Sequence, residues 1–103
     1  DYYENEFRNS GFRGPLNRYR NHPKDYEWLQ GWKGKRIEQP ALFIGGTRDP
    51  ATFLFGAVSD PVALMRKNAP QVEGHILDGV GHWTQQESPE EVNRLLLEWL
   101  KRV

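Results

Sequence analysis

The sequence predicts an α/β fold in which two parallel strands are joined by a crossover helix and followed by a C-terminal helix. Two short apolar runs, residues 40–45 and 74–78, are bounded by proline or glycine, as buried strands are. Helical patterns begin at Asp60 and at Ser88, so one follows each run. The order strand, helix, strand, helix implies a parallel pair with a right-handed crossover.

Composition divides the chain near Pro40. Residues 1–39 hold eight of the 13 aromatic residues and show no alternation of apolar and polar positions. They predict a helical segment that precedes the α/β part at residues 40–103.

Proline and glycine divide this N-terminal segment into short helices. Residues 1–8 can form a first helix that stops near Gly11. Pro15 suits the first turn of a second helix, which we expect Pro23 to end. Asp25 is then expected to cap one further turn.

Capping signals place the two helices of the α/β part. Asp60 is a typical N-cap followed by Pro61, and this helix is expected to stop near Pro70. The last helix begins with a capping box, in which Ser88 caps and Glu91 lies three residues later. Its apolar stripe comprises Val92, Leu95, Leu96, Trp99, Leu100 and Val103.

The overall composition excludes several functional classes. Fourteen basic and 14 acidic residues give the 103-residue chain no net charge, which argues against nucleic-acid and anionic-membrane binding. No apolar run approaches the ~20 residues of a membrane span. Cysteine is absent, which excludes disulfides and thiolate metal sites and favours a cytoplasmic location. Because the sequence begins at Asp1 and contains only one methionine, Met65, we expect a processed or partial chain.

Asp49 and His82 are the candidate catalytic residues. Each follows a predicted strand by four residues, so both are expected at the same edge of the sheet, where the sites of parallel sheets lie. A carboxylate that holds one imidazole nitrogen leaves the other free to activate water or a nucleophile. Alternatively, both are ordinary loop residues. The histidines show no metal-ligand spacing, so no metal or cofactor is expected, and His22 and His75 are assigned to structure.

Residues 40–49 and 79–100 resemble the C-terminal part of the α/β-hydrolase fold, and more narrowly that of its epoxide hydrolases. The resemblance implies that Asp49 is the acid and His82 the base in hydrolysis of a small-molecule epoxide to a vicinal diol. Residues 10–21 resemble the cap segment of this family, in which a tyrosine at the position of Tyr19 hydrogen-bonds the epoxide oxygen. The implied fold is a partial α/β-hydrolase fold preceded by the end of the cap.

The sequence departs from the family in one major respect. It contains no Gly-x-Ser-x-Gly or Gly-x-Asp-x-Gly elbow, so the family's nucleophile is missing. We therefore expect about the last third of an epoxide hydrolase, inactive alone, that pairs with the missing N-terminal hydrolase part or forms a homo-oligomer. Two alternatives remain: a non-catalytic, oligomerising module derived from a hydrolase, or a fragment of a dehalogenase-type α/β-hydrolase.

Overall fold

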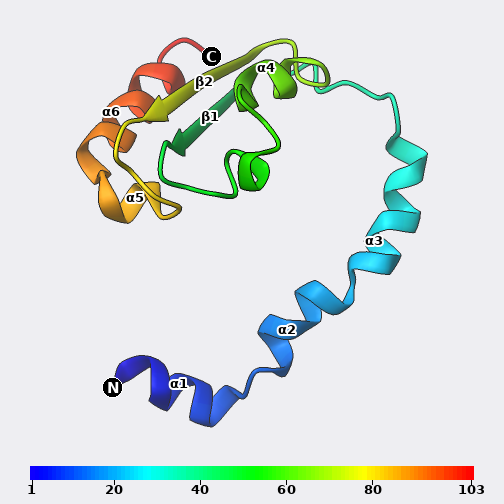
Figure 1. Ribbon diagram of the computed structural model, residues 1–103, viewed down its shortest axis with the longest axis vertical. Helices are drawn as coiled ribbons and strands as arrows, with labels where there is room; N and C mark the ends of the chain where they lie inside the picture. The colour runs from blue at the N-terminus through cyan, green and yellow to red at the C-terminus, as the bar shows by residue number, and fades with distance from the viewer. The chain divides into compact units, whose positions relative to one another are not determined.

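The computed structural model describes residues 1–103, which divide into two compact units, Asp1–Gly34 and Lys35–Val103. The first unit is entirely helical and the second contains both strands (Figure 1).

The first unit consists of α1 (Tyr2–Ser10), α2 (Arg13–Arg20), α3 (His22–Leu29) and a 3-10 turn, η1 (Gln30–Trp32). The Asp1 carboxylate caps α1 by accepting the Tyr3 N–H at 2.9 Å. Gly11, with φ 65°, ends α1 in a conformation that favours glycine. None of the side chains in these helices is fully buried.

Two expectations for this unit were wrong. Pro23 lies in the first turn of α3 and does not end α2, which stops at Arg20. Asp25 is inside α3 and caps nothing, because Asn21 occupies the N-cap position. The physical reason is that proline fits the first turn of a helix, where the missing N–H would be unpaired anyway.

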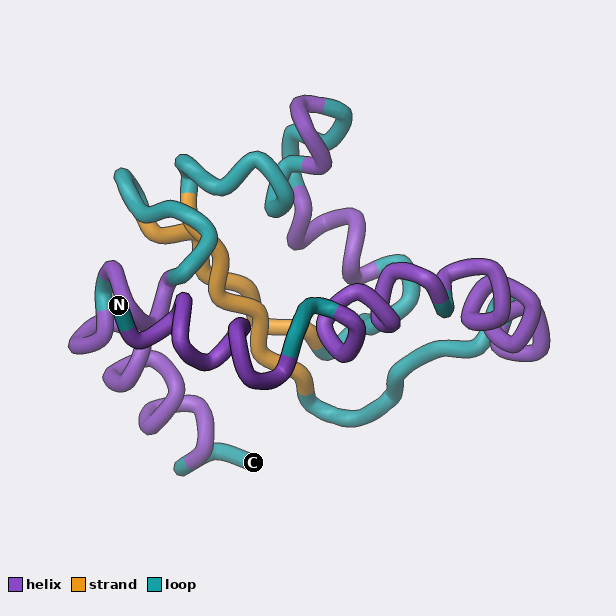
Figure 2. Tube along the Cα trace, turned by 90° about the horizontal axis from the view of Figure 1, so that it is seen from below, coloured by secondary structure: helices purple, strands orange, loops and turns teal.

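The second unit is built on β1 (Ala41–Gly46) and β2 (Val72–Leu77), which pair in parallel as predicted. The register runs from Ala41 opposite Val72 to Gly46 opposite Leu77, so both strands end together. Figure 2 shows the two strands running side by side.

Helices flank this strand pair. The crossover helix is α4 (Pro61–Arg66), and the chain ends in α5 (Thr84–Glu87) and α6 (Pro89–Leu100). Figure 1 shows α4 and α6 on different sides of the strands. As predicted, the Asp60 carboxylate caps α4, accepting the Ala63 N–H at 2.9 Å.

The core beside α4 is small. Its buried members are Val62, Ala69 and Val72, and the partly buried side chains around them include Phe43 and Met65. Leu95 is the only buried residue of α6. The apolar stripe of this helix is therefore only partly covered, and Leu96, Leu100 and Val103 remain exposed.

The capping box expected at α6 does not form. Ser88 is the N-cap, but its hydroxyl makes no capping hydrogen bond. The Glu91 carboxylate instead accepts two hydrogen bonds from Arg94, at 2.6 and 2.9 Å. A bidentate, charge-assisted pair three residues along the helix competes successfully for this carboxylate.

No helix, including the 12-residue α6, has the length and apolar character needed to cross a bilayer.

Candidate active site

Backbone hydrogen bonds fasten together the two loops that leave the C-terminal ends of β1 and β2. The Arg48 N–H donates to the Val80 carbonyl, and the Thr47 N–H donates to the Leu77 carbonyl, both at 2.9 Å. A Cβ on Gly46 would lie 2.0 Å from the Val80 carbonyl oxygen, so only glycine allows the loops to approach this closely. The parallel register thus brings residues 33 positions apart to one sheet edge.

The Asp49 carboxylate is buried and accepts three hydrogen bonds. Its Oδ1 accepts the Ala51 N–H at 2.8 Å, and its Oδ2 accepts the Thr52 hydroxyl at 2.8 Å. The third donor is His82, whose Nδ1 lies 3.1 Å from the same Oδ2. The side chain of Asp49 is only 8% exposed to solvent, so these contacts replace nearly all of its hydration.

These surroundings keep Asp49 ionised. Burial of the carboxyl raises its pKa, but the hydrogen bonds from His82, Thr52 and Ala51 together outweigh this effect. The pKa of Asp49 therefore lies below its ordinary value. An ionised carboxylate can only accept, so the proton between the two side chains belongs to His82 Nδ1.

His82 consequently presents Nε2 as its unprotonated nitrogen when the ring is neutral. Nε2 makes no hydrogen bond within the chain, and the His82 side chain is 60% exposed. One imidazole nitrogen is oriented by a buried carboxylate while the other stays available to a reactant. This is the arrangement from which histidine acts as a general base.

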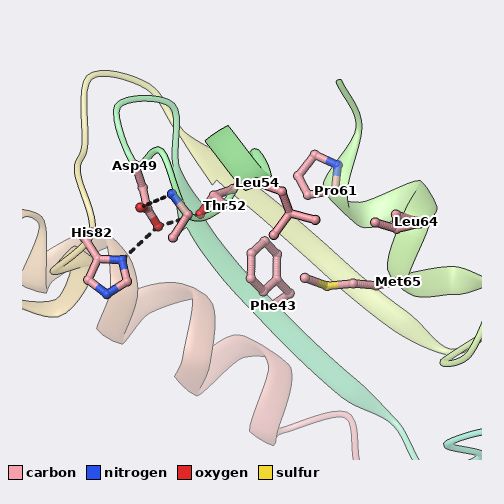
Figure 3. A pocket seen from close by; sticks show the side chains of 9 residues that line it. Phe43, Asp49, Thr52, Leu54, Pro61, Leu64, Met65 and His82 are labelled. Carbon is pink, nitrogen blue, oxygen red and sulfur yellow. Dashed lines mark hydrogen bonds and ion pairs between the residues drawn. The ribbon is translucent and has the colours of Figure 1, made fainter. Parts of the chain in front are cut away.

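A cavity of about 280 Å³ adjoins the pair. Asp49, Thr52 and His82 lie at one end, and apolar side chains from β1, the loop after it and α4 form the rest (Figure 3). These apolar side chains are Phe43, Ala51, Leu54, Pro61, Leu64 and Met65. The cavity could hold a small, largely apolar molecule beside the imidazole.

Sequence reasoning identified the Asp49–His82 contact but missed Thr52 and Leu54. Thr52 was recognisable in principle, because an Asp at the start of a turn commonly binds groups two and three residues later. Leu54 gave no signal. It has a left-handed backbone, φ 45°, as has the next residue, Phe55, at φ 54°. Such strain in residues other than glycine is uncommon and occurs beside functional sites.

Tyr19, the third residue expected at the site, lies on α2 in the first unit. It is largely exposed, and its ring meets that of His22 edge to face at a centroid distance of 5.8 Å. Its hydroxyl makes no hydrogen bond within the chain.

His75, assigned to structure, lies in β2, where its Nε2 is 2.9 Å from Glu73 Oε1. No cluster of three or more potential metal-ligating side chains occurs in the chain.

Comparison with protein-family profiles finds no match. Among individual proteins, epoxide hydrolase B of Mycobacterium tuberculosis is 46% identical over 97% of the chain, and rat bifunctional epoxide hydrolase 2 is 42% identical over 98%. The chain spans 28% and 17% of the lengths of these two relatives.

Solved structures give the same result. An epoxide hydrolase from an endophytic Streptomyces superposes with a TM-score of 0.82 at 47% identity, over 92% of this chain and 28% of that one. Potato (Solanum tuberosum) epoxide hydrolase I gives 0.87 at 28% identity, over 100% of this chain and 33% of the potato chain. The chain is therefore homologous, along nearly its whole length, to the C-terminal part of epoxide hydrolases of the α/β-hydrolase fold.

Proposed function

We propose that this chain supplies the acid and the base of an epoxide hydrolase, which converts an epoxide to a vicinal diol. The observation that carries the proposal is the 3.1 Å hydrogen bond from His82 Nδ1 to Asp49 Oδ2, beside an apolar cavity. Asp49 holds the ring and stabilises the imidazolium, while Nε2 takes a proton from water. The resulting hydroxide attacks the ester formed between the epoxide carbon and a nucleophilic carboxylate.

Tyr19 is proposed to act on the epoxide oxygen when the ring opens. Opening the ring develops negative charge on this oxygen, and a phenol O–H can donate a hydrogen bond or a proton to it. The free Tyr19 hydroxyl and the surrounding cap-like residues 10–21 support this role.

The nucleophilic carboxylate is not among the residues of this chain, because no nucleophile elbow occurs in the sequence. We therefore propose that the 103-residue chain is inactive by itself and that an N-terminal hydrolase part completes the site. Association with another copy is the alternative way to cover its exposed apolar side chains. The substrate class is a small, largely apolar epoxide, and the co-reactant is water alone. The cytoplasmic location stays a prediction from the sequence.

A chimera tests the proposed function. The segment of M. tuberculosis epoxide hydrolase B that aligns with this chain is replaced by residues 1–103, and hydrolysis of styrene oxide is measured. We expect turnover, and we expect His82→Gln to reduce it by about 10²-fold or more, the usual contribution of a general base. Asp49→Asn should also reduce it strongly, because the imidazole then loses the carboxylate that fixes its tautomer. His75→Gln is the matched histidine control and should retain activity.

Mass spectrometry identifies the step that is lost. A His82→Gln chimera should accumulate the covalent ester, because ring opening still occurs while its hydrolysis does not. A folded chimera without turnover, or with turnover insensitive to His82, would refute the assignment.

A further inference from the structure

Hydrogen bonds to Thr47 and Arg48 hold Gly79 and Val80 at the start of the loop that carries His82, but the His82 backbone makes none. His82 lies between Gly81 and Trp83 on an exposed turn, and its side chain makes one hydrogen bond within the chain. Its only ring contact is an edge-to-face approach to the neighbouring Trp83 at 5.3 Å. Because this imidazole is largely exposed and makes one hydrogen bond, its distance from Asp49 depends on where its backbone is held.

The Glu87 carboxylate anchors the backbone on either side of His82. Its Oε2 accepts the N–H of Gly81 at 2.8 Å, and its Oε1 accepts the N–H of Trp83 at 3.3 Å. One carboxylate therefore holds the backbone N–H groups of the residues before and after His82. Hydrogen bonds to an ionised acceptor are about twice as strong as neutral ones.

The position of Glu87 depends on α5, the short helix that the sequence analysis did not predict. The N–H groups of Gln86 and Glu87 donate to the Trp83 carbonyl at 2.8 and 2.9 Å, which folds the chain back over the turn. Gly81 leaves room for the carboxylate, since a Cβ there would lie 2.7 Å from Glu87 Oε1. The contact between Glu87 and the His82 turn therefore depends on both α5 and Gly81.

We propose that Glu87 is a positioning residue, which sets the His82 backbone so that Nδ1 faces Asp49 and Nε2 stays free. Glu87 does not line the cavity, so it acts only through His82. The inference rests on the proposed function only where it treats His82 as the base. Its test requires no turnover, so a failure of either proposal can be distinguished from a failure of the other.

The tautomer of His82 is the direct readout. Long-range ¹H–¹⁵N correlation spectra of the ¹⁵N-labelled 103-residue chain, at about pH 8.5 where an ordinary imidazole is neutral, report which ring nitrogen carries the proton. The native chain should show the Nδ1–H form. Glu87→Ala should lower the ratio of Nδ1–H to Nε2–H by about threefold to tenfold, the range expected when the geometry of one hydrogen bond is lost.

Three further variants make the result specific. Glu90→Ala removes an exposed acid three residues away that makes no hydrogen bond within the chain, and it should leave the ratio unchanged. Glu87→Gln retains one acceptor oxygen for the Gly81 N–H but presents an NH₂ group where Trp83 N–H also donates, so an intermediate ratio is expected. Gly81→Ala displaces the carboxylate without removing it, and it should lower the ratio as Glu87→Ala does.

The tautomer ratios decide the proposal. A native ratio in Glu87→Ala, with the dispersed amide spectrum of β1 and β2 preserved, would overturn it. If Glu87→Ala fails to fold, Glu87→Gln and Gly81→Ala decide together, because neither variant truncates the side chain of residue 87. A native ratio in Glu87→Gln together with a native ratio in Gly81→Ala would likewise overturn the proposal.

Discussion

The packing of α4 on β2 can be tested by a double-mutant cycle at Gly74 and Val62. A Cβ added at Gly74 would lie 2.3 Å from Cγ2 and 2.6 Å from Cγ1 of Val62, and 3.0 Å from its Cβ. Rotation about χ1 cannot relieve this overlap, because both methyl groups and their parent carbon are too close. Gly74→Ala must therefore push α4 away from β2.

The expected energies follow from the size of the overlap. Carbon atoms in contact normally lie about 3.5–4.0 Å apart, so the helix would have to move by about 1 Å. Overpacking of this kind costs about 1–3 kcal/mol, and we expect a value of about 2–3 kcal/mol here. Val62→Ala removes two buried methyl groups, at about 0.8 kcal/mol each before any cavity cost, which gives about 2 kcal/mol.

The double variant separates overpacking from simple loss of contacts. The methyl group that Gly74→Ala introduces would occupy the space that the Val62 methyl groups vacate, so the double variant should cost about 2 kcal/mol and not the sum of about 4–5 kcal/mol. Urea unfolding followed by circular dichroism, at one fixed protein concentration, measures each free energy of unfolding. Gly14→Ala, where a Cβ meets no atom within 4 Å, is the control and should not destabilise the chain.

If the destabilisation of the double variant equals the sum of the two single values, α4 does not pack this closely on β2. The consequence reaches the site, because α4 contributes Pro61, Leu64 and Met65 to the cavity wall. A displaced α4 widens the cavity beside His82.

Three other predictions follow from the site and from the uncovered surface. The hydrogen bonds that lower the pKa of Asp49 contribute stability above the ordinary carboxyl pKa of about 4, and this contribution is lost as pH falls through the folded-state pKa. Thr52→Val should raise the pKa of Asp49 in a ¹³C carboxyl titration and move acid unfolding to higher pH, and an unchanged titration would contradict the role of the hydroxyl. The 103-residue chain alone should not hydrolyse styrene oxide; turnover that disappears in His82→Ala would show that His82 acts directly on water. Sedimentation equilibrium at micromolar concentration should show association beyond the monomer, and a monomer that unfolds cooperatively on heating would contradict this.

The strand pair and the Asp49–His82 contact could be predicted because each depends on a strong, local pattern. Short apolar runs bounded by proline or glycine fix the strands, and parallel pairing places the following loops at one edge. The polar contacts around the pair were harder to foresee. Whether Thr52 reaches Asp49, or Glu87 reaches back to Gly81, depends on turn geometry that residue type alone does not determine.

The errors share a physical cause, which is competition for one group. Glu91 could cap the first turn of α6 or pair with Arg94, and the bidentate ion pair prevailed. Pro23 could end one helix or begin the next, and it lies in the first turn of α3, where its missing N–H leaves no hydrogen bond unmade. Sequence patterns show which interactions are available, but their relative energies decide between them.

The distribution of exposed apolar side chains connects the fold to the proposed function. In the first unit the exposed residues include Tyr2, Tyr3, Phe12, Tyr26, Trp28 and Trp32. In the second they include Leu96 and Leu100 on α6 and Val103 beyond its end. Apolar surface buried on association contributes about 25 cal/mol per Å², so covering several of these side chains yields several kcal/mol. That is comparable with the whole stability of a small domain. The chain spans only 28% and 17% of the two relatives. We propose that a hydrolase part corresponding to their additional residues covers these side chains. The same association would bring a nucleophile to the His82 side of the cavity, so completion of the core and completion of the active site are expected to be one event.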